Sequence, residues 1–190
     1  MLISACVMIF AMLHHPHGVS DNRFQITVMK WVHASLMFLL IFNTLGLVRL
    51  RHVVAANSQD MALGFVFYYV GLGSFLIATL ASGFVQTSLI EFYKIDTQAF
   101  SNLSSFATIL NQAFAKLGTI SFGASGVFLF PAMNCKAGTL RLVGITGAIV
   151  GMVLVISIMT GVYLSVTTMT LLSILIIIWH CSIAVWLLNN

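Results

Sequence analysis

The charged residues of this chain are few, and long uncharged runs separate them. The 190 residues include eight Lys or Arg and four Asp or Glu, while 60% of the residues are hydrophobic. A soluble domain has about 25% charged residues because its surface faces water, and a chain with 6% cannot cover such a surface. The pattern therefore predicts a polytopic integral membrane protein, and it argues against a soluble enzyme, a disordered linker or a nucleic-acid binder.

Helices are the expected structure, because backbone groups in lipid must be satisfied within their own segment. A span needs about 20 apolar residues. Cutting the chain at its charges predicts an all-α bundle of about six transmembrane helices, in which the first is short and the fourth is long and amphipathic. The bundle forms a single domain over residues 1–190, with a loop expected from Gln86 to about Ser101. The expected helices are Met1–Leu13, Ile26–Val48, Met61–Val85, one from near Ala99 to near Ala132, Leu140–Val166 and Met169–Leu188.

Basic residues lie on both sides of the predicted bundle. One side has Arg49, Arg51, His52, Lys136 and Arg141, and the other has Arg23, Lys30, Lys94 and Lys116. The first set is packed into short loops beside helix ends, where the positive-inside bias acts. We therefore expect both termini in the cytoplasm, and a bacterial inner membrane or an organellar inner membrane as the location.

The fourth predicted helix has two stripes at helical spacing. The apolar stripe consists of Phe100, Leu103, Ala107, Leu110, Phe114 and Leu117, and the polar stripe of Ser101, Ser104, Ser105, Thr108, Asn111 and Gln112. The polar stripe has two interpretations. It is either a face at the external headgroup layer or the wall of a hydrated cavity or subunit contact.

Small residues recur on the third and fifth predicted helices. They are Gly64, Gly71, Gly73 and Ala78 on the third, and Gly144, Gly147, Ala148 and Gly151 on the fifth. Such residues let helix backbones approach closely in lipid. No Asp or Glu lies inside a predicted span, which disfavours an ion-coupled transporter. The first hypothesis is therefore a non-catalytic membrane protein, a small or accessory subunit whose partners are the lipid bilayer and other membrane subunits.

Histidines cluster after the first predicted helix. They are His14, His15 and His17, and His33 lies about two turns into the second helix. Pro16 cannot continue a helix, so the chain turns here and brings the cluster toward His33. Imidazoles bind copper, zinc or iron, and the thioethers of Met8, Met12 and Met29 would suit reduced copper. The second hypothesis is a haem- or copper-binding redox protein that uses these four histidines as metal ligands. The alternative is that the loop histidines face water or headgroups and His33 bonds a carbonyl on a neighbouring helix.

His180 lies in the middle of the sixth predicted helix, beside Trp179. An imidazole at membrane depth tends to face the interior of the bundle and to have a partner there. If the predicted topology holds, the helices of His33 and His180 run the same way. The two histidines are therefore a candidate pair of axial ligands for a haem.

The fourth predicted helix carries the motif G-x-S-G at residues 123–126. A serine needs a nearby general base to become a nucleophile, and His180 follows on the sixth helix. The arrangement resembles the rhomboid intramembrane serine proteases, whose six-helix core has a G-x-S-G serine on its fourth helix and a histidine on its sixth. The resemblance implies an intramembrane serine hydrolase with Ser125 as nucleophile and His180 as base.

The likeness to rhomboids extends in part to the second predicted helix. Trp31 and His33 match the tryptophan and histidine of that family, whereas Met37 stands where its oxyanion asparagine is found. No glycine follows His180 at the position that family uses to close its helices. The alternative role of the motif is close helix packing by its small residues.

Overall fold

Every regular element is a helix in the parts of the chain that the computed structural model describes, residues 2–15, 22–54, 58–93, 97–134 and 138–189. The elements are α1 (Leu2–Leu13), α2 (Arg23–Val54), α3 (Gln59–Leu80), the π-helical segment η1 (Ala81–Val85), α4 (Gln86–Phe92), α5 (Gln98–Asn134), α6 (Thr139–Met159) and α7 (Val166–Leu188). The prediction of an all-α fold is confirmed.

Five helices of the described chain are long and apolar enough to cross a membrane. They are Arg23–Val54, Gln59–Phe92, Gln98–Asn134, Thr139–Met159 and Val166–Leu188. The second of these is one continuous helix made of α3, η1 and α4. The short first helix α1 has 12 residues, a length of about 18 Å against a hydrocarbon core of about 30 Å. The multi-pass prediction is confirmed for five helices, and the expected sixth span is not among them.

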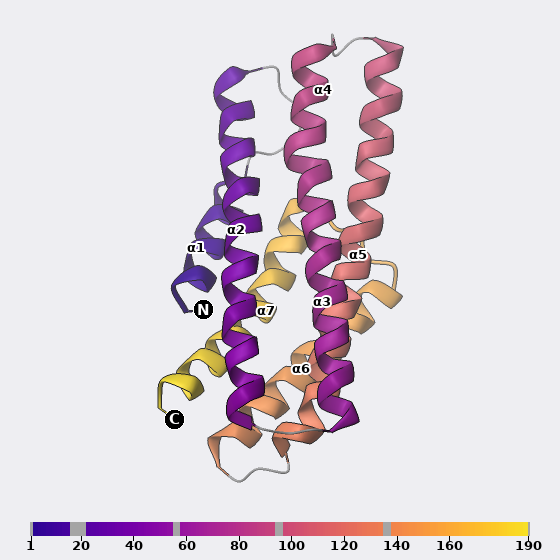
Figure 1. The fold of residues 1–190 in the computed structure, drawn as a ribbon. Helices are drawn as coiled ribbons and strands as arrows, with labels where there is room; N and C mark the ends of the chain where they lie inside the picture. The colour runs from indigo at the N-terminus through magenta and orange to yellow at the C-terminus, as the bar shows by residue number, and fades with distance from the viewer. Residues whose placement is uncertain (1, 16–21, 55–57, 94–96, 135–137, 190) are drawn as a thin grey trace.

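Three long helices set the height of the bundle. Figure 1 shows α2, the α3–α4 helix and α5 running along its whole length, while α6 and α7 are tilted and cover its lower part. The short helix α1 lies beside α2 (Figure 1) and also contacts α7, because Met8 and Ala11 pack with Leu36, Leu40 and Ile177 in one buried cluster.

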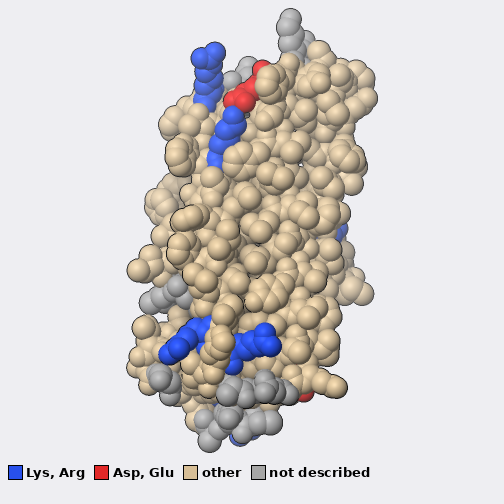
Figure 2. Space-filling view, in the orientation of Figure 1, with Lys and Arg blue, Asp and Glu red and all other residues tan. Residues whose placement is uncertain are grey.

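The surface matches a lipid environment. In the face shown in Figure 2, most Lys and Arg side chains gather near the two ends of the molecule, and the broad region between them is uncharged apart from one small basic patch at its right edge. Large apolar side chains such as Phe38, Val66 and Ile149 are exposed on the helices. Such a surface would be costly in water and is favourable against acyl chains.

Glycines bring α5 and α6 into close contact. A Cβ atom at Gly123 would lie 2.6 Å from the Gly151 carbonyl oxygen, and one at Gly126 would lie 3.1 Å from the Gly147 carbonyl carbon. No side chain larger than hydrogen fits between these backbones. The predicted packing face on α6 is therefore buried against α5 within the same chain.

The loop expected from Gln86 to about Ser101 is wrong, because the helix continues to Phe92 and α5 begins at Gln98. The stretch Gln86–Phe92 holds no Pro or Gly, and its polar side chains bond within the bundle. Thr87 donates to the Gly83 carbonyl oxygen (2.7 Å), and Gln86 donates to the Thr108 hydroxyl (2.9 Å). The polar residues that begin at Gln86 mark the end of the apolar run, but the helix continues through them.

The break between the last two helices also differs from the prediction. A helix was expected over Leu140–Val166, but α6 ends at Met159 and α7 begins at Val166. Gly161 has φ of 81°, a left-handed conformation that favours glycine and ends helices. Ser165 then caps α7 by accepting from the Thr168 amide (3.2 Å).

Candidate functional site

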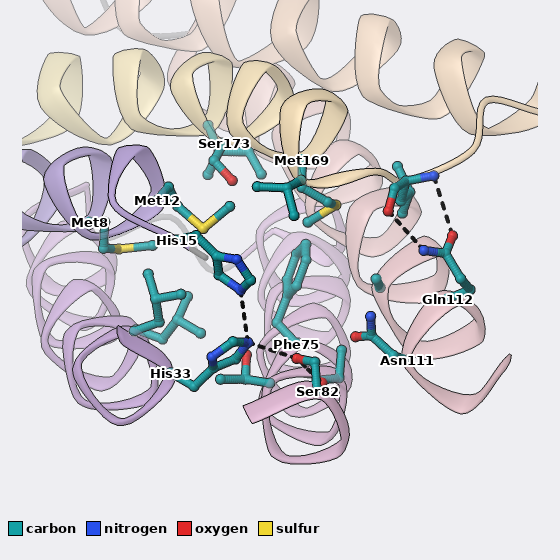
Figure 3. Close-up of a pocket in the computed structure, with 18 of the residues that line it drawn as sticks. Met8, Met12, His15, His33, Phe75, Ser82, Asn111, Gln112, Met169 and Ser173 are labelled. Atoms are coloured by element: carbon teal, nitrogen blue, oxygen red, sulfur yellow. Dashed lines mark hydrogen bonds between the residues drawn. The ribbon is translucent and has the colours of Figure 1, made fainter. Parts of the chain in front are cut away.

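A cavity of about 310 Å³ lies between α1, α2, α3, α5, α7 and the α6–α7 connection. Most of its walls are apolar, and no Asp, Glu, Lys or Arg is among the described residues that line it. We define its two ends by the histidines that line them. The His33 end contains His15, His33 and Ser82 (Figure 3), and the His180 end contains Asn43, Tyr68 and His180.

Two imidazoles face one another at the His33 end. The Nε2 atoms of His15 and His33 are 3.4 Å apart, and the Ser82 hydroxyl lies 2.8 Å from the same His33 nitrogen (Figure 3). His33 Nδ1 is 2.8 Å from the Met29 carbonyl oxygen, which can only accept. Nδ1 therefore carries the proton in the neutral ring, and Nε2 presents its lone pair to the cavity.

The π-helical segment brings α3 against His33. A π turn inserts one extra residue into a helix, and such turns are frequent at functional sites. Here the turn includes Ser82, which bonds His33, and Gly83, where a Cβ atom would lie 2.9 Å from His33 Cδ2. The absence of a side chain at Gly83 therefore makes room for the imidazole.

Thioethers line the same end of the cavity. Met12 extends from α1 on the side of His15 (Figure 3), and Met29 precedes His33 by one helical turn, whereas Met8, one turn before Met12, lies beside Asn43. Met8 Sδ accepts a hydrogen bond from Asn43 Nδ2 (3.3 Å). Sulfur and imidazole ligands are thus present together in an apolar surrounding.

The polar stripe of α5 divides between the two expected roles. Thr108, Asn111 and Gln112 line the cavity, whereas Ser101 and Ser105 are exposed. Gln112 also holds the chain before α7, because its amide donates to the Leu164 carbonyl oxygen (2.7 Å) and accepts from the Leu164 amide (3.2 Å). The stripe is a cavity wall in its C-terminal part only.

His180 lines the other end of the cavity. Its Nδ1 donates to the Ile176 carbonyl oxygen (2.9 Å), and its Nε2 is buried without a hydrogen-bond partner in the described structure. The rings of Tyr68 and Phe122 pack at near right angles to the imidazole, with centroids 6.2 and 6.5 Å away. The His180 ring therefore has an acceptor nitrogen without a hydrogen-bond partner in the described structure, and aromatic side chains pack around it.

The four predicted metal-ligand histidines are in different positions. His15 and His33 are brought together, as described above. His14 is exposed and turned back on its own helix, with Nδ1 bonded to the Phe10 carbonyl oxygen (2.9 Å). His17 lies outside the described residues. Among the described residues no group of three or more His, Cys, Asp or Glu could hold a metal ion.

The candidate haem ligands His33 and His180 line one cavity at different depths. His33 contacts Ser82 and His180 contacts Tyr68, residues that are 14 positions apart on the α3–α4 helix. This spacing is about 21 Å of helix rise. Axial nitrogens on one iron would be about 4 Å apart, since each metal–nitrogen bond is about 2 Å.

Ser125, the candidate nucleophile, lies away from the cavity lining. Its hydroxyl is buried without a hydrogen-bond partner in the described chain, as is Nε2 of the candidate base His180. The flanking residues Gly123 and Gly126 contact α6. The motif therefore serves the α5–α6 contact, and the structure does not join its serine to an imidazole.

Sequence reasoning missed Ser82, Gly83 and Gln112. The run Ala81-Ser82-Gly83 of small residues was visible in the sequence, but its partner His33 is 49 positions from Ser82 along the chain. The Gln112 amide belonged to a recognised polar stripe, yet its bond to Leu164 spans 52 positions. Such pairings depend on how the helices pack.

The fold and the cavity define the class as a multi-pass helical protein whose helices are long and apolar enough to cross a membrane, with an internal, mostly apolar cavity. No family model, curated protein or solved structure matches the chain.

Proposed function

We propose that this membrane protein binds one transition-metal ion, copper in its reduced state, through His15 and His33. The observation that carries the proposal is the 3.4 Å separation of the two Nε2 atoms inside the cavity. With metal–nitrogen bonds of about 2.0–2.1 Å, two ligands at a tetrahedral angle would be about 3.3–3.4 Å apart. Small movements of the two rings would therefore suffice to seat an ion between them.

The hydrogen bonds around His33 are compatible with this role. Its Nδ1–H bond to Met29 orients the ring, which is the usual support for a metal-bound imidazole. The Ser82 hydroxyl is also 3.1 Å from the Ala78 carbonyl oxygen. When His33 binds a metal, Ser82 can donate there and leaves no unpaired donor.

The choice of copper follows from the other ligands that line this end. Thioether sulfurs favour reduced copper over harder ions, and Met12 extends from α1 on the side of His15. No carboxylate of the described chain lines the cavity, so magnesium and calcium lack the oxygen ligands they prefer. A site with two imidazoles and one or two thioethers is the proposed form.

The accessory-subunit hypothesis has less support than the metal hypothesis. It depended on glycine faces, and Gly123, Gly126, Gly147 and Gly151 contact one another between α5 and α6. These residues are therefore unavailable to a partner subunit. As part of the proposal, the protein lies in a bacterial or organellar inner membrane with both termini on the cytoplasmic side, that of Arg49 and Arg51. Five spanning helices would place the two ends of the chain on opposite sides, so a cytoplasmic N-terminus requires that α1 also cross the membrane.

The test is copper(I) titration of the purified protein in detergent, in competition with a chromogenic copper(I) chelator. We expect one ion per chain. His33→Ala should weaken binding at least 100-fold, since it removes a ligand. The matched control is His14→Ala, whose imidazole is exposed and bonded to its own helix, and its affinity should stay within twofold of the unmodified chain.

Two results would contradict the proposal. One is a stoichiometry well below one ion per chain in folded protein. The other is equal loss of affinity in the His14→Ala and His33→Ala variants, because that would place the ion on the exposed face of the cluster and not in the cavity.

A further inference from the structure

The His180 end of the cavity holds a buried acceptor that no described residue satisfies. Three buried side-chain atoms in the described structure lack a hydrogen-bond partner, Ser125 Oγ, Trp179 Nε1 and His180 Nε2. Of these three residues only His180 lines the cavity, and because its Nε2 is itself fully buried, a ligand reaches that nitrogen only when neighbouring side chains move. A buried polar atom without a partner is costly and calls for a specific explanation.

A hydrogen bond within α7 decides which nitrogen of the neutral His180 ring carries the proton. Nδ1 is 2.9 Å from the Ile176 carbonyl oxygen, which has no hydrogen to give. Nδ1 must therefore donate, and Nε2 of the neutral ring is an acceptor. Because the Nδ1 edge faces α7, Nε2 points away from α7, toward the side where the Tyr68 and Phe122 rings lie.

The surroundings restrict what could donate to this nitrogen. The cavity lining has no charged Asp, Glu, Lys or Arg among the described residues, so an ionised ligand would find no counter-charge there. The walls near His180 are aromatic: the Phe122 ring packs 5.0 Å from that of Tyr68 and stacks at 5.3 Å on that of Phe75. Flat rings pack well against such walls.

We propose that the His180 end binds an uncharged amphiphile that carries a phenolic hydroxyl, which donates to His180 Nε2 while its ring packs against Tyr68, Phe75 and Phe122. The apolar tail of the ligand would extend along Leu36 and Leu40. Such a molecule reaches the site from the bilayer, where uncharged amphiphiles concentrate. This site is independent of the proposed copper site, because it uses a different histidine at the other end of the cavity.

The experiment uses a matched pair of probes, 4-hexylphenol and 4-hexylanisole, its methyl ether. The two have similar apolar bodies, and only the phenol can donate a hydrogen bond. Binding to the purified chain in detergent is measured by titration calorimetry, with micelles alone as the blank. Emission of Trp179, whose ring centroid is 5.5 Å from that of His180, is followed as a second signal.

We expect the phenol to bind the unmodified chain about three- to tenfold more tightly than the ether, the usual range for one neutral hydrogen bond. In His180→Phe, which keeps an aromatic ring but no acceptor, the two probes should bind equally. Ser125→Ala is the control, because it removes a buried hydroxyl that does not line the cavity. The preference for phenol should persist in that variant.

Three results would overturn the proposal. The first is equal binding of phenol and ether to the unmodified chain, which is independent of how any variant folds. The second is no saturable binding of either probe. The third is a phenol preference that persists in His180→Phe, since the donor would then be recognised elsewhere. Copper binding is measured separately, so failure here does not bear on His15 and His33.

Discussion

Two regions of the bundle differ in how closely neighbouring helices pack. One is the contact between α5 and α6, and the other is the cavity. At the contact, glycines remove side chains and the backbones touch, with Gly123 and Gly126 against Gly151 and Gly147. Around the cavity, long side chains from α1, α2 and α7 hold the helices apart and leave about 310 Å³ between them. The comparison teaches that small residues close one side of this bundle, so that the other side can remain open around two imidazoles.

The largest expected change in stability is at the contact between α5 and α6. In Gly123→Ala the new Cβ atom would lie 2.6 Å from the Gly151 carbonyl oxygen and 2.9 Å from Val155 Cγ2. Because one of these neighbours is backbone, relief requires the helices to separate. We expect a loss of about 3 kcal/mol in the free energy of unfolding, the upper end for overpacked sites, measured by denaturant titration in detergent.

The matched control for that substitution is Gly73→Ala on α3, where a Cβ atom would meet nothing within 4 Å. Replacing glycine by alanine in a helix then raises the free energy of unfolding by about 0.5–1 kcal/mol. If both variants lost the same stability, close contact between α5 and α6 would not be what closes this side.

A smaller effect is expected at Gly83, which lies beside His33 at the cavity. In Gly83→Ala the Cβ atom would lie 2.9 Å from His33 Cδ2 and closer still to His33 Cβ and Cγ. The imidazole must move, so we expect copper(I) affinity to fall about 10–100-fold, as when the support of a metal ligand is lost. The measurement is chelator competition on the folded fraction, and unchanged affinity would show that Gly83 does not position His33.

A third prediction concerns the polar wall of the cavity. Gln112→Ala removes both bonds to the backbone of Leu164, and we expect a loss of about 2 kcal/mol in the free energy of unfolding, about 1 kcal/mol for each bond. Hydrogen exchange at the Leu164 amide should accelerate in parallel. Gln98→Ala, whose amide bonds only the exposed Asn102 side chain among the described residues, should change stability by less than about 0.5 kcal/mol.

The smallest effect is expected at the ion pair that joins α2 to α4. Lys30 Nζ and Glu91 Oε1 are 2.7 Å apart, and both side chains are partly exposed. A double-mutant cycle with Lys30→Ala and Glu91→Ala should give a coupling of about 0.2–1 kcal/mol that falls as salt is added. A larger, salt-independent coupling would mean that this pair, and not the cavity lining, fixes the distance between the two helices.

The sequence predicted the helical segments better than their ends. Hydropathy located the five spanning helices, because exclusion from water acts on each segment separately. It ended one helix at Val85 and another at Val166, whereas the structure ends them at Phe92 and Met159. The ends depend on bonds such as that of Gln86 to Thr108, which form only when α4 and α5 are adjacent.

The candidate site was predicted in part. The expectation that the chain turns at Pro16, a residue that cannot continue a helix, correctly indicated that His15 lies near His33. Pro16 itself lies outside the described residues. The sequence could not separate His15 from His14, whose imidazole turns back to Phe10. It also could not show that Ser125 is not among the described residues that line the cavity beside His180.

The sequence by itself determined that the chain is helical and that its helices are apolar enough to cross a membrane, since composition and the spacing of charges act on each segment without reference to the others. Tertiary structure alone decided that the glycines of α5 and α6 face one another and that His15 and His33 meet at Nε2. Both depend on the rotation of each helix about its own axis, which packing between distant segments sets.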